Sequence, residues 1–156
     1  MPDWLHCMSL GVCQHFLGFL PNEVAACNAL QVAGTTASER LEGTARQVHV
    51  LLVKWYAAER RAGRERNEVG DLTVGMLGES PDEGVALNGG EANDMLVWCV
   101  EFMLPSCEGL RQADTFRVAG AALCSVLRLL RAGVQRWTLA MAQATPRLCS
   151  PGLSSW

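Results

Sequence analysis

Apolar residues recur every three or four positions near the start of the chain, which is the helical period. Asp3 stands where the N-cap of such a helix belongs, because its carboxylate suits the free amides and positive end of the first turn. Pro21 interrupts the pattern, which resumes from Val24 to Val32. We therefore expect a helix over 3–20 and a kink or a restart at Pro21. The apolar positions of the first stretch are Leu5, Met8, Val12, Phe16, Leu17 and Leu20.

A second amphipathic stretch follows a capping-box motif. Thr36 and Glu39 have the spacing in which the hydroxyl caps the helix and the glutamate reaches back to the N-cap amide. The apolar face then predicts a helix of about four turns that ends near Gly63. Its positions are Leu41, Ala45, Val48, Leu52 and Trp55.

The second half of the chain predicts a glycine-rich connection and two more helices. Periodicity is lost between Val69 and Asn93, where only 72–74 suggests a short extended piece. Residues 91–104 are helical in pattern, and Pro105 is expected to stop that helix. The last helix is expected to begin between 106 and 112 and to continue past Gly133 to Met141. We predict a mainly α protein, with four or five helices in an irregular bundle over residues 1–144 and a disordered tail at 145–156.

Composition narrows the class of protein. The 156 residues are 49% hydrophobic, enough for one domain with a core. With 13 basic and 16 acidic residues, the chain is a poor candidate for binding nucleic acid. The seven cysteines include no C-x-x-C pair, which favours reduced thiols over a zinc ribbon.

The apolar N-terminal run lacks the basic flank of a signal peptide and is too polar to span a bilayer. We expect a soluble intracellular protein, nuclear or cytoplasmic, that is not secreted and does not bind membranes.

The sharpest candidate for chemistry is the acid and imidazole pair at the start of the chain. Asp3 and His6 are one helical turn apart and Cys7 follows, so the three side chains could share a metal ion on one helix face. The simpler interpretation, which the local sequence favours, makes Asp3 a helix cap, His6 a surface or half-buried imidazole and Cys7 a core thiol. No cofactor is expected.

Four arginines at the end of the second helix offer a weaker candidate. Arg60, Arg61, Arg64 and Arg66 could contact phosphate, with Trp55 and Tyr56 available to stack on bases. Glutamates at 59, 65 and 68 are interleaved with them. We favour a solvated, salt-bridged helix end over a nucleic-acid contact.

Two blocks of the chain resemble transposase-derived reading frames that are abundant in dinoflagellate genomes. The first runs from Met1 through Leu17-Gly18 and is similar to a "P-x-D-x-x-H-x-x-x-L-G-V" segment. The second comprises 71–77 and 86–93, similar to an "L-T-x-x-M" stretch followed by "L-x-G-x-x-A/G-E". The order and approximate spacing agree over about residues 1–131.

The resemblance implies a relic of a DDE-type transposase. In that family a D-x-x-H signature, which Asp3 and His6 match, follows the second catalytic aspartate of an RNase H-like core. The first two catalytic aspartates would precede residue 1, and the last glutamate would follow a helical insertion in which this chain ends. Strand cleavage needs the full carboxylate set to hold two divalent ions. We therefore expect a catalytically incomplete fragment that is not an enzyme.

Two other functions remain open at this point. A small helical interaction module could bind a partner, or a second copy of itself, through an exposed apolar helix face. A metal-dependent hydrolase centred on Asp3 and His6 is the remaining alternative.

Overall fold

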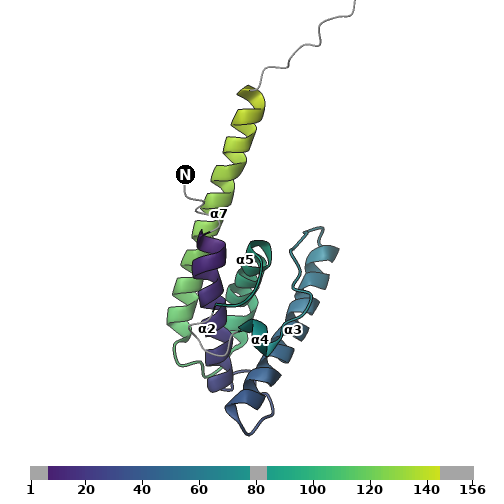
Figure 1. Cartoon of the computed structure of the whole chain (residues 1–156), viewed down its shortest axis with the longest axis vertical. Coiled ribbons are helices and arrows are strands. Elements are labelled where there is room, and N and C mark those ends of the chain that lie inside the picture. The colour runs from purple at the N-terminus through teal and green to yellow at the C-terminus, as the bar shows by residue number, and fades with distance from the viewer. Residues whose placement is uncertain (1–6, 78–83, 145–156) are drawn as a thin grey trace, which may run out of the picture.

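The computed structural model describes residues 7–77 and 84–144, and side chains as far as Arg136. Within these ranges the chain consists of helices and irregular connections, with no strand. The predicted mainly α, irregular bundle is therefore confirmed (Figure 1). Its longer elements are α2 (Cys13–Ala26), α3 (Ala37–Arg61), α5 (Gly89–Trp98) and α7 (Ala113–Ala144).

The first helical stretch differs from the sequence expectation at both Pro21 and its end. A π-helical turn, η1 (Met8–Val12), leads into α2, and Pro21 lies inside that helix without ending it. Pro21 has no amide hydrogen to donate within the helix. Next to it, the Asn22 Nδ2 donates a hydrogen bond to the Gly18 carbonyl at 2.8 Å. The helix ends at Ala26, and not at Val32, because Asn28 enters the left-handed region with φ 49°.

The capping box of α3 is confirmed. The Glu39 amide donates to the Thr36 hydroxyl at 3.1 Å, and the Thr36 amide donates to the Glu39 carboxylate at 3.1 Å. The helix runs to Arg61, and its predicted apolar face packs into the core at Ala45, Val48, Leu52 and Trp55.

The glycine-rich connection carries one helical turn, which packs against α2 and α3. The short extended piece expected at 72–74 is not formed; instead α4 (Val74–Leu77) makes one turn. Farther on, the Val85 amide donates to the Gln14 carbonyl at 3.0 Å, which ties this connection to α2. Helix α5 begins at Gly89, two residues earlier than expected, because Asn88 and Glu91 form a second capping box.

The last two helical runs complete the bundle. Helix α5 continues through η2 (Cys99–Met103) into α6 (Leu104–Ser106), so Pro105 sits in the final turn and does not stop the helix before it. Helix α7 begins at Ala113, one residue after the predicted range, and passes Gly133 without interruption, as predicted. It extends well beyond the other helices (Figure 1).

Helix α2 lies between α3 and α7, and α5 packs against all three. Helix α7 packs tightly against its neighbours at Gly120, where an added Cβ would lie 2.5 Å from Val100 Cγ2 and 3.1 Å from Phe16 Cζ. The core is therefore continuous from α3 to α7, and α7 packs on its edge. Its largest fully buried side chains include Tyr56, Leu17, Leu20, Leu52, Leu77, Met95 and Leu96.

Candidate functional site

The metal candidate at the start of the chain falls mostly outside the part that the structure describes. Asp3 and His6 lie in residues 1–6, which are not described, and Cys7 is exposed. Among residues 7–77 and 84–144, no group of three or more histidine, cysteine, aspartate or glutamate side chains is placed to hold a metal ion. The candidate site on Asp3, His6 and Cys7 remains a prediction.

The arginines at the end of α3 converge on one buried carboxylate. Glu59 is buried, and its two oxygens accept hydrogen bonds from the Arg64 and Arg66 guanidinium groups at 2.5–3.0 Å. These charge-assisted hydrogen bonds hold the pKa of Glu59 down at about 2. The salt-bridged helix end favoured from the sequence is thus present, and Arg60 adds an ion pair with Glu68 at 3.2 Å.

Arg66 joins this cluster to helix α5. Its Nη1 lies 3.3 Å from Asp94 Oδ1, and its guanidinium carbon lies 5.0 Å from the centre of the Trp55 ring. Asp94 is buried and also accepts hydrogen bonds from the Asn67 amide and side chain, each at 2.8 Å. We call Glu59, Arg64, Arg66, Asn67 and Asp94 the Glu59 cluster. It fastens the segment after α3 onto α5.

The aromatic residues beside this cluster face the core. Trp55 is 7% exposed and Tyr56 is 1% exposed, and the Tyr56 hydroxyl accepts from the Val69 amide at 3.2 Å. Buried rings leave no open face for a base, so stacking would require the cluster to open. Arg61, whose Nε donates to the Ala57 carbonyl at 3.2 Å, remains exposed. Any contact of these four arginines with nucleic acid remains a prediction.

The sequence interpretation missed Asp94 as a member of the Glu59 cluster. The sequence signal for Asp94 was the position of its carboxylate between Ala92 and Met95, which lie on the buried face of α5. A charged residue at such a position needs a buried partner, because an unpaired buried charge is very costly. The sequence could not identify that partner as Arg66, which lies 28 residues earlier.

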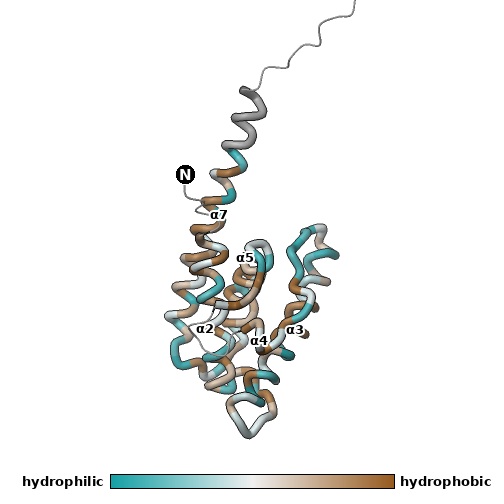
Figure 2. Tube along the Cα trace, in the orientation of Figure 1, coloured by the Kyte–Doolittle hydropathy of each residue, from teal (hydrophilic) through white to brown (hydrophobic). Residues whose placement is uncertain are grey.

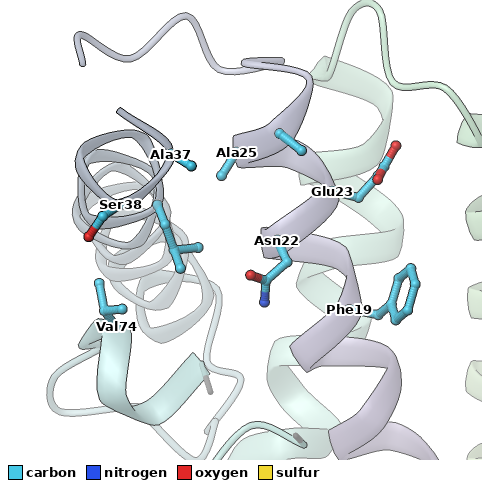
Figure 3. A pocket seen from close by; sticks show the side chains of 9 residues that line it. Phe19, Asn22, Glu23, Ala25, Ala37, Ser38 and Val74 are labelled. Atoms are coloured by element: carbon cyan, nitrogen blue, oxygen red, sulfur yellow. The ribbon is translucent and has the colours of Figure 1, made fainter. Parts of the chain in front are cut away.

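A pocket of about 570 Å³ lies between α2, α3 and α4 (Figure 3). Asn22 points from α2 toward Ser38 and Val74, whereas Phe19 and Glu23 lie on the side of α2 away from Ser38. The Glu23 carboxylate forms an ion pair with Arg111 and accepts a hydrogen bond from the Cys27 thiol, each at 3.3 Å. The carboxylate in this lining is thus already paired, and most of the other lining side chains are apolar, so the pocket offers no evident group for catalysis.

An apolar groove of about 500 Å³ runs between α2 and α7. Aromatic contacts form its base, since the Phe116 ring centre lies 5.8 Å from that of Phe16 and 6.3 Å from that of Phe19. His15 and Thr115 contribute the polar side chains among its lining residues. We call this site the α2–α7 groove. It is lined by Val12, His15, Phe16 and Phe19 on one side and by Thr115, Phe116, Ala119, Ala122, Leu123 and Val126 on the other.

The apolar surface continues along α7 beyond the groove. Phe19 is 43% exposed, Val126 is 39% exposed, and Leu129 is 74% exposed. Hydrophobic residues recur on α7 up to the point where it leaves the bundle (Figure 2). The segment Ala113–Arg136 is long and apolar enough to cross a membrane by length and composition, and only 17% of the window that meets this criterion is buried. A large part of this apolar helix is therefore uncovered in the single chain.

The buried cysteines behave as core residues. Burial raises the pKa of Cys13 to about 11, and it also raises the pKa values of Cys99, Cys107 and Cys124. A thiol with a raised pKa is a poor nucleophile near neutral pH. These four residues therefore contribute packing and offer no nucleophile for catalysis.

Comparison of the chain with protein-family models, curated proteins and solved structures found no match. The resemblance to transposase-derived reading frames consequently rests on the two sequence blocks alone. Among the described residues, the α2–α7 groove is an open site of appreciable size with an almost entirely apolar lining.

Proposed function

We propose that this chain is a small helical interaction module that binds an amphipathic helix in the α2–α7 groove. The observation that carries the proposal is the open aromatic base of the groove beside the exposed Val126 and Leu129 side chains. Contiguous exposed apolar patches on soluble proteins mark interaction sites, because water covers them unfavourably.

The shape and lining of the groove favour a helix as the ligand. It lies between two helices, and a third helix can lie along it as in other helix-in-groove interactions. Ala119 and Ala122 keep the α7 wall low, which lets another backbone approach closely. The phenylalanine rings provide the base against which large apolar side chains of the ligand would pack.

Direct binding of a designed peptide tests this proposal. The probe is a fluorescein-labelled amphipathic helix of about 18 residues, with leucine at heptad positions a and d and alternating glutamate and lysine elsewhere. We expect saturable binding to the full chain, measured by fluorescence anisotropy, with a dissociation constant on the order of 10 μM.

Two variants of adjacent residues locate the binding surface. Ala122 lines the groove, whereas Ala121 is exposed on the same helix and does not line it. Ala122→Glu should weaken peptide binding by about tenfold or more, because it places a charge against the apolar ligand face. Ala121→Glu is the matched control and should bind as the unmodified chain does. Absence of saturable binding, or equal weakening by both variants, would contradict the proposal.

We also propose, on the two sequence blocks described above, that the chain derives from a transposase and does not itself cleave DNA strands, a reaction that needs a full carboxylate set holding two divalent ions. Incubation with Mg²⁺ or Mn²⁺ and a labelled DNA duplex is then expected to give no cleavage. The alternative of a hydrolase on Asp3 and His6 requires bound metal, so metal analysis of the purified chain tests it directly. Stoichiometric Zn²⁺ or Mn²⁺ that is lost in both Asp3→Asn and His6→Ala would favour the hydrolase over the relic.

A further inference from the structure

Helix α7 is longer than the bundle on which it packs. Its last buried residue among the described side chains is Leu127, yet the helix continues to Ala144. At 1.5 Å per residue, residues 131–144 extend about 20 Å past the bundle. The α7 side of the groove, residues 115–126, is about 17 Å long. The projecting segment therefore matches the groove in length.

We propose that the ligand of the α2–α7 groove is the projecting part of α7 from a second copy of this chain. This inference rests on the proposed function, since it requires the groove to bind a helix. Each copy would supply one groove and one projecting segment, so a single two-fold axis satisfies both. Two identical contacts would then cover the apolar surface of both chains.

The antiparallel arrangement follows from the positions of groove and projecting segment on one helix. If two α7 helices cross antiparallel with their midpoint near Leu129, residues 115–126 of each lie beside residues 131–142 of the other. A parallel pair would set the projecting segments side by side and leave both grooves open. Only the antiparallel pair fills the grooves.

The exposed surface of α7 has the spacing that a helix pair needs. Ala119, Ala122, Val126, Leu129 and Gly133 follow one another at intervals of three, four, three and four residues. This average of 3.5 is the repeat of a seam between two helices. The seam starts in the groove and continues to Gly133 in the projecting segment, where the next position of the repeat is Arg136.

Gly133 supports a close approach of another backbone. A glycine inside a helix costs about 1 kcal/mol relative to alanine. A Cβ added at Gly133 would meet no atom of the described chain within 4 Å, in contrast to Gly120. Packing within one copy therefore gives no reason for this glycine, whereas the antiparallel pair places it beside Ala122 and Val126 of the second copy.

Part of the positive charge on α7 is compensated within one chain. Arg117 pairs with Asp114 at 3.1 Å, and Arg128 pairs with Glu101 at 3.4 Å within the same chain. Arg117 and Arg128 are thus compensated before a second copy arrives, whereas Arg131 and Arg136 add positive charge to the projecting segment. The apolar contact must therefore outweigh this remaining charge for two copies to associate.

Sedimentation velocity of the full chain tests the inference. We expect a monomer–dimer equilibrium between about 1 and 100 μM, the range in which a modest interface populates both species. Ala122→Glu should raise the dimer dissociation constant by about tenfold or more, and Ala121→Glu should leave it unchanged. Leu129→Glu gives a second disruptive variant on a highly exposed side chain, with Val118→Glu as its control at a position that is 71% exposed.

Photo-crosslinking tests the antiparallel geometry. Benzoylphenylalanine in place of Ser125, an exposed residue that flanks the seam, should form crosslinks with residues 131–142 of another copy. Mixing ¹⁵N-labelled and unlabelled chains identifies such products by mixed-isotope peptides. Crosslinks from position 125 to the same region of the second copy would indicate a parallel pair and overturn the geometry.

The outcomes separate this inference from the proposed function. A chain that stays monomeric at 100 μM but binds the designed peptide overturns the second copy as ligand and leaves the groove as a helix-binding site. A chain that neither dimerises nor binds the peptide overturns both. A dimer that Ala122→Glu and Leu129→Glu leave intact, with circular dichroism showing native helix content, overturns the α7 interface.

Discussion

Arg66 donates two hydrogen bonds to the same oxygen of Glu59, from Nε at 3.0 Å and from Nη2 at 2.7 Å. The Glu59 side chain is 7% exposed, so this pair lies in the interior, unlike the exposed pair of Arg60 with Glu68. Arg66 contacts Asp94 as well, which connects the end of α3 to α5. The pair is therefore positioned to stabilise the packing of two helices that are distant in sequence.

Glu59→Gln is expected to destabilise the fold at neutral pH by about 1–3 kcal/mol, because Arg66 would lose its charged partner in a buried place. The control is Glu68→Gln, whose ion pair is exposed and should contribute less than about 1 kcal/mol. Urea unfolding of both variants at pH 7, followed by circular dichroism, measures the two effects. Equal stability of the two variants would show that the Glu59 cluster does not stabilise the fold.

The pH dependence of stability provides an independent prediction for Glu59. Its pKa is lowered from 4.5 to about 2 in the folded chain, so the charged form is favoured by folding. The resulting stabilisation is fully present above the unfolded value near 4.5 and is lost as the pH falls toward 2. Between pH 4.5 and 2, unfolding free energy should fall less steeply in Glu59→Gln than in the unmodified chain. Parallel slopes would contradict the lowered pKa.

The sequence predicted the helices because their signals are local. Thr36 with Glu39 marked the start of α3, and the apolar spacing marked its buried face. The interruption expected at Pro21 is not formed, because a helix can retain a proline when side chains nearby bond to its carbonyls, as Asn22 does to Gly18. The turn at Asn28 has a left-handed backbone conformation and lacks the glycine that would have marked it in the sequence.

The candidate site was less predictable because it depends on contacts between distant segments. Phe16 and Phe116, which are 100 residues apart in the sequence, together form the base of the groove. In the sequence alone, each has the pattern of an ordinary core residue. The pattern of α7 did indicate small residues suited to close packing, but not which of them the bundle would leave exposed. That distinction requires the position of α2, which the structure supplies.

Cysteine reactivity should report the burial of the core. In a short pulse of iodoacetamide at pH 8, exposed Cys7 should be alkylated faster than Cys13 or Cys99 by more than about a hundredfold. The raised pKa values of the buried thiols add to their protection. Peptide mass spectrometry measures each site, and the same pulse in urea provides the unfolded reference. Rapid labelling of Cys99 without denaturant would contradict a closed core.

Gly120→Ala is expected to destabilise the chain despite the higher helix propensity of alanine. The added methyl group would lie 2.5 Å from Val100 and 3.1 Å from Phe16, so both neighbours must move. Overpacking of a core costs about 1–3 kcal/mol, which exceeds the helical gain of up to about 1 kcal/mol. Urea unfolding of the monomer should show a net loss. A more stable variant would mean that α7 can shift away from η2 without cost.

Gly133→Ala, on the same helix, is expected to change stability in the opposite direction. A methyl group there meets no described atom within 4 Å, so the monomer should gain up to about 1 kcal/mol from helix propensity alone. The variant should therefore melt at a higher temperature at low concentration, where the chain is monomeric. In the proposed antiparallel pair, however, the same methyl group would enter the seam beside Ala122 and Val126 of the second copy, so dimer dissociation should become easier. A more stable monomer with a weaker dimer is the combined result that distinguishes close helix approach from helix propensity, because propensity alone would strengthen α7 in both states.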